Sequence, residues 1–255
     1  MSTPTLAAAR TACVLRLADT NLVLAQRLGE WIGHAPALEE DLGLANLALD
    51  HLGQARLFYG YAAELEGGNR SEDDFAFLRD ESAFVNLALA EQPNTDFAFA
   101  IVRQLLIDAY QLELYAALER SSDERLAQIA AKALPEVRYH LRYSSGWAVR
   151  LGDGTPESQR RMQVALEALW RFTPELFACD AIEQVLAAQS IAPDPAALES
   201  RWSASIDPIL ARATLQRPAD ASYPWYGKCG VHTEHLGPLL AQMQHLHRAH
   251  PGARW

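Results

Sequence analysis

The sequence predicts an all-α protein, and three observations support that prediction. Its 255 residues include 44 Ala and 37 Leu but only 9 Val and 8 Ile, so strong helix formers far outnumber β-branched residues. Apolar residues recur at spacings of three and four along most of the chain, which is helical periodicity. A hydrophobic content of 49% excludes disorder and allows a large core.

The first two long helices are expected over 14–32 and from Leu38 to about Leu65. The residues before the first helix are expected to fray. Gly33–Pro36 separates the two helices, and Gly67 with Gly68 ends the second, so they should pack antiparallel. The apolar stripe expected to face the core from the second helix is Leu38, Leu42, Ala45, Leu49 and Leu52. Its first turn carries Glu39, Glu40 and Asp41, which the positive end of the helix dipole favours.

A short helix is expected around 84–90, a third long helix over 96–120 and a fourth over 123–151, which Pro135 should kink or divide. The third helix should face the core with Ile101, Leu105, Leu112 and Tyr115. Shorter helices are expected near 157–177, 180–188, 195–215 and 233–249. Four long helices with such connections are typical of an antiparallel bundle. The prediction is a single domain over 1–255, with the core bundle at about 11–151 and additional C-terminal helices at about 157–250.

Charge and cysteine usage exclude several classes of function. A formal net charge of -10 disfavours nucleic acid as a partner. Cys13, Cys179 and Cys229 are widely spaced and contain no CxxC pair, so neither a disulfide framework nor a thiolate zinc site is indicated, and a reducing cytoplasm is expected. Cys13 and Cys179 are expected to be core residues. The longest apolar run, 97–102, is far too short to span a membrane.

A bundle of long helices can house a carboxylate-bridged di-metal centre, which requires a Glu-x-x-His pair on each of two helices. Spacing of three places both ligands on one face of a turn. Each of the eight histidines has a residue other than Asp or Glu three positions earlier. The sequence therefore predicts that a complete di-metal site is absent.

Fragments of such a site remain on the third and fourth helices. Asp108 shares the core-facing side of the third helix, and His140 lies one turn from Glu136 on the fourth. A residual or mononuclear metal site is one interpretation. The favoured one is a buried polar network in which Asp108 is satisfied by His140 or Arg138. Asn46, Asp50 and Gln54 form a similar row on the second helix, facing either the core or solvent.

The segment His232–His235 resembles a ligand cluster but lacks a second imidazole at a spacing of four. Thr233 is expected to cap the last helix and Glu234 to lie at its N-terminus. The preceding aromatic loop, Tyr223–Gly230, is wrongly spaced for phosphate binding by Lys228, so docking of another chain is the preferred interpretation and a solvent-exposed turn is the alternative. Nucleophilic catalysis is not indicated, because the chain lacks a Gly-x-Ser-x-Gly elbow.

Five blocks of sequence, in order and at matching separations, carry a resemblance to a known family. They are Ala25–Trp31 with Gly33–Pro36, Leu52–Arg56, Tyr139–Arg142 with Trp147, Gly230–Pro238, and the closing Gly252–Trp255. Together they resemble the PaaC family of phenylacetyl-CoA epoxidase subunits, an enzyme also called phenylacetate-CoA oxygenase. The resemblance covers nearly the whole chain.

The resemblance implies a ferritin-like, structural subunit of the cytoplasmic monooxygenase that forms the ring-1,2-epoxide of phenylacetyl-CoA in aerobic phenylacetate degradation. In that family the related subunit PaaA holds the di-iron centre, and a reductase supplies electrons from NADPH through FAD and an iron–sulfur cluster. The expectation is that this chain has no catalytic, cofactor or metal residues of its own and pairs with PaaA and the other subunits. The family's Glu-x-x-His positions fall on Leu52 with Ala55 and on Val137 with His140.

Two alternatives stay open. One is an active metal-dependent oxidoreductase of the ferritin-like type that uses Glu136, His140, His232, Glu234 and His235. The other is a freestanding helical protein that binds an acyl-CoA or an aromatic ligand. Within the epoxidase, contact of this chain with the coenzyme A tail stays open, and Arg56, Lys228 and Arg142 are the candidates by charge. A homodimer in the absence of partners is also possible, because an exposed apolar face would favour self-association.

Overall fold

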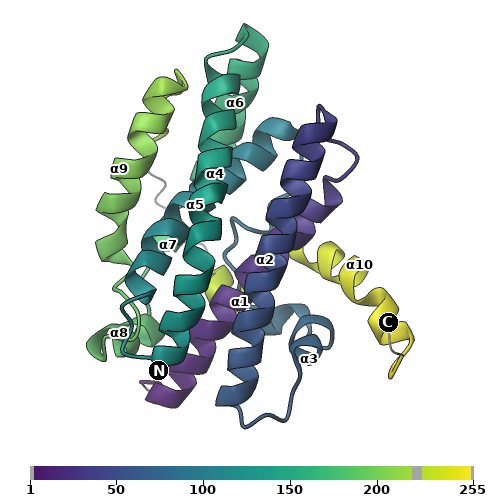
Figure 1. Cartoon of the computed structure of the whole chain (residues 1–255), viewed down its shortest axis with the longest axis vertical. Coiled ribbons are helices and arrows are strands. Elements are labelled where there is room, and N and C mark those ends of the chain that lie inside the picture. The colour runs from purple at the N-terminus through teal and green to yellow at the C-terminus, as the bar shows by residue number, and fades with distance from the viewer. Residues whose placement is uncertain (1–2, 220–225, 254–255) are drawn as a thin grey trace. The chain divides into compact units, whose positions relative to one another are not determined.

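The structure, a computed structural model, describes residues 3–219 and 226–253, and these residues form helices joined by loops, of which 78–96 is a long one (Figure 1). The helices are α1 (Leu6–Glu30), α2 (Leu38–Leu65), α3 (Glu72–Phe77), α4 (Phe97–Leu118), α5 (Glu124–Gly152), α6 (Pro156–Trp170), α7 (Pro174–Phe177), α8 (Ala181–Ala188), α9 (Ala196–Arg212) and α10 (Leu236–Ala249), with 3₁₀ turns η1 (Glu81–Ala83) and η2 (Gly227–Cys229). The all-α prediction is confirmed, and this helix content is consistent with a ferritin-like helical bundle.

The helix ends follow local signals in the sequence. Asp96 and Asp123 cap α4 and α5 by accepting hydrogen bonds from the backbone N–H three residues later. Asp180 forms a capping box with Glu183 at the start of α8. At the end of α2, Gly67 and Gly68 take positive φ values of 89° and 78°, which glycine adopts without steric cost.

Several expected elements differ from those observed. The helix α1 begins at Leu6, so residues 6–13 are helical instead of frayed. Residues 84–90 are not helical; the short helix α3 and the turn η1 precede them. The helix α5 runs through Pro135 as one element and is not divided. Two helices, α6 and α7, replace the single one expected over 157–177.

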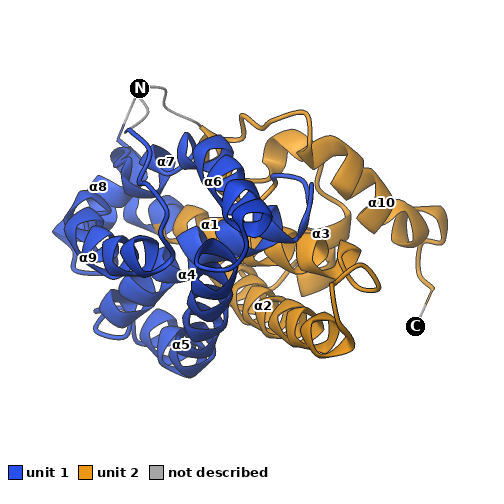
Figure 2. Ribbon diagram, turned by 90° about the horizontal axis from the view of Figure 1, so that it is seen from above, with its two compact units in different colours: residues 1–9, 92–225 blue, residues 10–91, 226–255 orange. Residues whose placement is uncertain are grey.

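The chain forms two compact units, drawn in different colours in Figure 2. Unit 1 comprises residues 1–9 and 92–225, and unit 2 comprises residues 10–91 and 226–255. No helix among the described residues is long and apolar enough to cross a membrane.

The helix α4 is the centre of unit 1. Residues 100–111 are buried without interruption, and α5, α6 and α9 pack against the helix. The helices α4 and α5 run antiparallel, because Phe97 near the start of α4 contacts Trp147 near the end of α5, while Asp108 further along α4 contacts Ser144. Trp202 of α9 donates its indole N–H to the Leu106 carbonyl of α4 at 3.0 Å. A helix buried on all sides is the expected centre of a bundle.

The end of α5 also lies very close to the end of α9 within unit 1. A Cβ atom at Gly152 would lie 2.2 Å from the Ala213 carbonyl oxygen. Thr214 donates its hydroxyl to the Gly152 carbonyl at 2.8 Å. Glycine is therefore required at the end of α5 for steric reasons.

In unit 2, α1 and α2 form an antiparallel pair, as expected. Asn21 of α1 contacts His51 of α2, whereas Asp19, earlier in α1, contacts Tyr59, later in α2. The C-terminal helix α10 packs on α3 and η1, where the Gln244 amide donates to two backbone carbonyls at 3.0 Å.

The prediction of the core-facing side of α2 is wrong. The expected stripe is exposed at its four leucines, with exposed fractions of 70% for Leu38, 57% for Leu42, 64% for Leu49 and 37% for Leu52. The side of α2 that is buried instead carries Leu44, Leu47, Ala48, His51, Gln54, Ala55 and Phe58. Both stripes have helical spacing, so periodicity alone does not tell which one enters the core of this chain.

Candidate functional site

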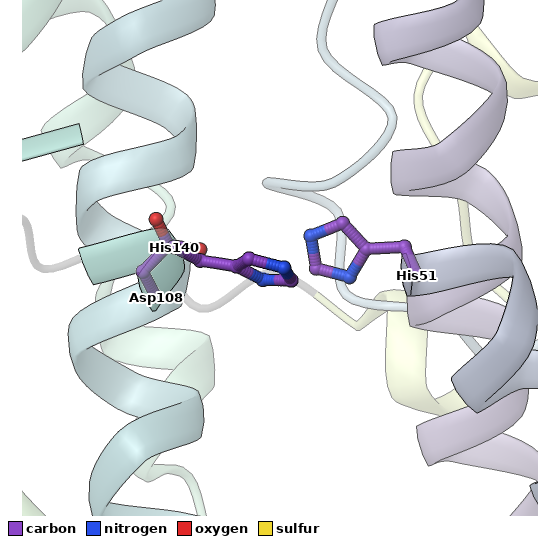
Figure 3. Close-up of side chains that lie close together, drawn as sticks. All are labelled: His51, Asp108 and His140. Carbon is purple, nitrogen blue, oxygen red and sulfur yellow. The ribbon is translucent and has the colours of Figure 1, made fainter. Parts of the chain in front are cut away.

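The buried carboxyl of Asp108, on α4, is the centre of the polar cluster in unit 1. Its side chain is fully buried. Gln104, one turn earlier on α4, donates to one oxygen at 2.6 Å, and Ser144 of α5 donates to the other at 2.7 Å. A carboxylate oxygen of Asp108 and an imidazole nitrogen of His140 lie within 4.8 Å of each other (Figure 3).

The surroundings of Asp108 change its acidity. Burial raises its pKa from 3.8 to about 8, although the hydrogen bonds from Ser144 and Gln104 act in the opposite direction. At neutral pH the folded chain therefore holds this carboxyl mainly in its neutral form. A neutral, hydrogen-bonded carboxyl is how a protein accommodates such a group in an apolar interior.

The neighbours expected around His140 are only partly present. His140 is fully buried on α5 as expected. Arg138 is exposed, so the expectation that it satisfies Asp108 is wrong, and Glu136 is only half-buried. Val137, three residues before His140, is fully buried and apolar. A buried polar network is present around Asp108, but its hydrogen-bond donors are Gln104 and Ser144 instead of Arg138.

These residues do not fit a di-iron centre. Such a centre takes two Glu-x-x-His pairs and two further carboxylates from four helices. On α5, Val137 occupies the carboxylate position of the pair that ends in His140 and has no donor atom. On α4, Asp108 already accepts two hydrogen bonds from protein side chains. Among the described residues of unit 1, this part of α4 and α5 offers one carboxyl and one imidazole instead of a complete ligand set.

The positions expected for the other pair, Leu52 with Ala55, differ in burial, because only Ala55 is buried. Leu52 is exposed, whereas His51, beside it on α2, is fully buried and its Nδ1 lies 2.8 Å from the Asn21 side-chain oxygen. His51 is also labelled in Figure 3, and it belongs to unit 2. Ala48, three residues earlier, is the matching buried position. The buried pair on α2 is thus Ala48 with His51, which again lacks the carboxylate.

The segment 232–235 has a structural role within unit 2. The two ring nitrogens of His232 lie 3.0 Å from a Glu91 carboxylate oxygen and 2.9 Å from the Phe84 carbonyl oxygen. The Thr233 backbone N–H donates to the other Glu91 oxygen at 2.6 Å, and Asn86 donates to Glu91 at 3.0 Å. Both Glu91 oxygens accept hydrogen bonds from protein groups. This carboxylate therefore links the C-terminal segment to the loop before α4.

His232 binds its proton more tightly in the folded chain. Burial alone would lower its pKa, but the hydrogen bond and the charge of Glu91 outweigh that effect, so the pKa lies above 6.5. Because both ring nitrogens face acceptors, only the protonated imidazolium can donate to both.

This arrangement predicts a pH-dependent stability. A raised pKa stabilises the fold fully below pH 6.5, and that stabilisation is lost as pH rises through the folded-state pKa. We expect the free energy of unfolding of the wild type, measured by urea denaturation, to show this decrease as pH rises. His232→Gln should not show it. His250→Gln, at an exposed histidine, should keep the wild-type pH dependence. The same loss in His232→Gln would contradict the role of His232.

The remaining expectations for this segment have different outcomes. The helix α10 begins at Leu236 with His235 as its N-cap, so Thr233 is not the cap. The Glu234 side chain is 84% exposed, and Lys228 is buried. Of the aromatic loop, Tyr223, Pro224 and Trp225 lie outside the described residues, while Tyr226 is 53% exposed. The alternative ligand set, Glu136 and His140 with His232, Glu234 and His235, is divided between the two units.

Of the cationic residues suggested for coenzyme A, Arg56 and Arg142 are exposed. Arg56 forms an ion pair with Glu72 at 2.8 Å, and Arg142 lies 5.2 Å from the Tyr139 ring centroid. The cysteines also differ from expectation, because Cys179 is exposed and Cys13 is only half-buried.

Sequence reasoning missed a buried carboxylate of unit 2 with several hydrogen-bond donors, Asp19. Arg79 forms a buried ion pair with it, and Tyr59 donates its hydroxyl to it at 2.6 Å. The Val85 backbone N–H donates to the second oxygen at 2.9 Å. Arg79 also donates to the Phe75 carbonyl at 2.7 Å. The one available signal was an acidic residue within the apolar repeat of the first helix.

Comparison with known proteins agrees with the sequence resemblance. Residues 2–255 match the family described as Phenylacetic acid catabolic protein, PaaA_PaaC. The chain belongs to this family. It is 54% identical over 245 residues to the C-type subunit of the 1,2-phenylacetyl-CoA epoxidase of Escherichia coli (strain K12), which covers 96% of this chain and 98% of that protein. The predicted resemblance is therefore confirmed, and with it the link to phenylacetate catabolism.

Proposed function

We propose that this chain is the structural, non-catalytic subunit of a phenylacetyl-CoA epoxidase and that it pairs with the di-iron subunit PaaA. The observation that carries the proposal is the incomplete ligand set: on α5 the residue three positions before the buried His140 is the buried Val137, and on α2 the residue before His51 at the same spacing is Ala48. The match to the C-type subunit of the E. coli epoxidase supports the role within a complex.

In this proposal Asp108 and His140 remain from an ancestral metal site and now serve the stability of the bundle. Buried polar groups are tolerated where partners satisfy them, as Gln104 and Ser144 do for Asp108. The chain contributes a rigid helical surface that keeps the iron-bearing helices of PaaA in position, because metal-ligand geometry must hold to within about half an ångström. FAD, the iron–sulfur cluster and NADPH belong to the reductase.

Co-expression with PaaA tests the proposal. We expect the two chains to elute together in size-exclusion chromatography, with an interface of more than about 2,000 Å². Iron measured by mass spectrometry should be far below one atom per molecule in this chain purified alone. Two chains that elute separately, or two iron atoms per molecule in the isolated chain, would contradict it.

Variants at the former site separate a structural role from a metal-binding one. Asp108→Ala and His140→Ala should lower the thermal midpoint of the isolated chain without lowering the iron content of the co-purified complex. A lower iron content in the complexes of Asp108→Ala and His140→Ala than in the wild-type complex would favour the alternative of a metal-dependent oxidoreductase.

A further inference from the structure

Unit 1 contains a cavity where α7 and the residues on either side of it meet α9. Its volume is about 300 Å³, and its lining includes Thr173, Phe177, Glu199, Trp202 and Arg217. Small-molecule pockets have volumes of about 300–1,000 Å³, so this cavity lies at the lower end of that range. Its size suits a single aromatic ring with a short side chain, whereas a whole coenzyme A thioester is too large for it.

One wall of the cavity is aromatic and held firmly in place. Phe177 and Trp202 are both buried, and their rings pack edge to face with centroids 5.3 Å apart. Phe177 also packs against Tyr110 of α4. The indole N–H of Trp202 donates to the Leu106 carbonyl at 3.0 Å. Aromatic pairs prefer edge-to-face and offset arrangements, so these fixed rings favour another aromatic ring as their neighbour in the cavity.

A positioned cation, Arg217, lies beside this aromatic wall. Its guanidinium carbon lies 5.0 Å from the Trp170 ring centroid and 6.0 Å from that of Trp202, which is the distance of a cation–π contact. Its Nη1 donates to Asp207 at 2.8 Å, in an ion pair whose side chains are 33% and 51% exposed. Exposed pairs of this kind are weak. Because a guanidinium carries five N–H donors in a planar fork that matches a carboxylate, Arg217 is placed to bind one at the cavity.

The charges of the lining decide which kind of anion the cavity favours. Besides the Arg217 cation, the lining carries the carboxylate of Glu199, which is exposed. One positive and one negative side chain provide no excess positive charge for a phosphate or a polyphosphate. A ligand with one negative charge and an apolar ring meets both conditions, because its carboxylate can contact Arg217 while its ring contacts Phe177 and Trp202.

We propose that this cavity binds a small aryl carboxylate, in which one aromatic ring is joined to a carboxylate by a short carbon chain. The ring lies against Phe177 and Trp202, and the carboxylate accepts hydrogen bonds from Arg217. Asp108 and His140 do not line the cavity, so the site is separate from the buried polar cluster. The proposal uses residues of unit 1 alone and does not depend on the function proposed above.

Isothermal titration calorimetry of the purified full chain with phenylacetate, a simple aryl carboxylate, tests the proposal. We expect one site with a dissociation constant of about 0.1–1 mM, which is in keeping with so small a ligand. Phenylacetamide keeps the ring without the charge, and hexanoate keeps the carboxylate without the ring. Each should bind at least about tenfold more weakly than phenylacetate. In NMR spectra, phenylacetate should shift the indole N–H signal of Trp202, assigned with Trp202→Phe.

Two substitutions with opposite expected effects locate the site. Arg217→Gln should raise the dissociation constant of phenylacetate about tenfold or more, whereas Glu199→Gln should lower it about twofold by removing a like charge. Both variants should keep the wild-type circular dichroism spectrum. Arg212→Gln, at an exposed arginine of α9 that does not line the cavity, is the matched control and should bind like the wild type.

Three results would overturn the proposal. They are no binding of phenylacetate at millimolar concentration, binding of phenylacetamide as tight as that of phenylacetate, and an unchanged affinity in Arg217→Gln. The two comparisons of ligands and the Glu199→Gln variant leave Arg217 in place, so they test the site even if Arg217→Gln does not fold.

Discussion

Replacing Arg79 by Met should lower the free energy of unfolding by about 3–5 kcal/mol, because it leaves the fully buried Asp19 carboxylate without its cation. Tyr59 and the Val85 N–H still donate to that carboxylate, but neither neutralises its charge. For a chain of this size the thermal midpoint should fall by about 10 °C. Differential scanning calorimetry measures this change.

Arg56→Met is the matched control for Arg79→Met. Its ion pair with Glu72 is 2.8 Å long and exposed, so the loss should stay below about 1 kcal/mol. The double variant Arg79→Met with Asp19→Asn should recover part of the loss, since it removes the stranded charge. Equal shifts of the thermal midpoint in Arg79→Met and Arg56→Met would show that the buried ion pair stabilises the fold no more than the exposed one.

Replacing Asp108 by Asn should stabilise the chain at alkaline pH. In the wild type the folded-state pKa is about 8 against 3.8 for the free group, so the folded chain binds one proton more than the unfolded chain between these values. The free energy of unfolding therefore falls as pH rises from about 4 to about 8. Asn carries no such charge, so at pH 8 the variant should be more stable by about 2–5 kcal/mol.

Urea unfolding at pH 5, 6.5 and 8 measures the effect of Asp108→Asn. The gain over the wild type should grow with each step in pH and level off above pH 8. Glu234→Gln removes a carboxylate from a side chain that is 84% exposed and should leave the pH dependence unchanged. A gain at Asp108→Asn that is constant across the range would mean that the carboxyl is already ionised in the folded chain.

The sequence determines most of the helices because their signals are local. Leu38 and Leu65 bound α2 as predicted, since Pro36 precedes the helix and two glycines follow it. The segment 84–90 is apolar in sequence but not helical. Its backbone instead supplies groups to Asp19 and His232, through Val85 and Phe84, and such long-range hydrogen bonds leave no periodic trace in the sequence.

The candidate site was predictable in kind but not in detail. Counting residues three positions before each histidine shows that the sequence contains no Glu-x-x-His pair, and the structure adds where the histidines lie. The resemblance placed the α2 pair at Leu52 and Ala55, of which Leu52 is exposed, whereas Ala48 and His51 have the same spacing and are both buried. The same ambiguity affected the stripe Leu38, Leu42, Ala45, Leu49 and Leu52 of α2, because an apolar stripe that faces the core and one that is exposed have the same helical spacing.

Iron-edge anomalous diffraction from crystals of the co-purified complex with PaaA tests the central claim most directly. Our account predicts anomalous peaks only within PaaA and none beside Asp108 and His140 of this chain. A peak between those two side chains, at a height comparable to those in PaaA, would contradict it.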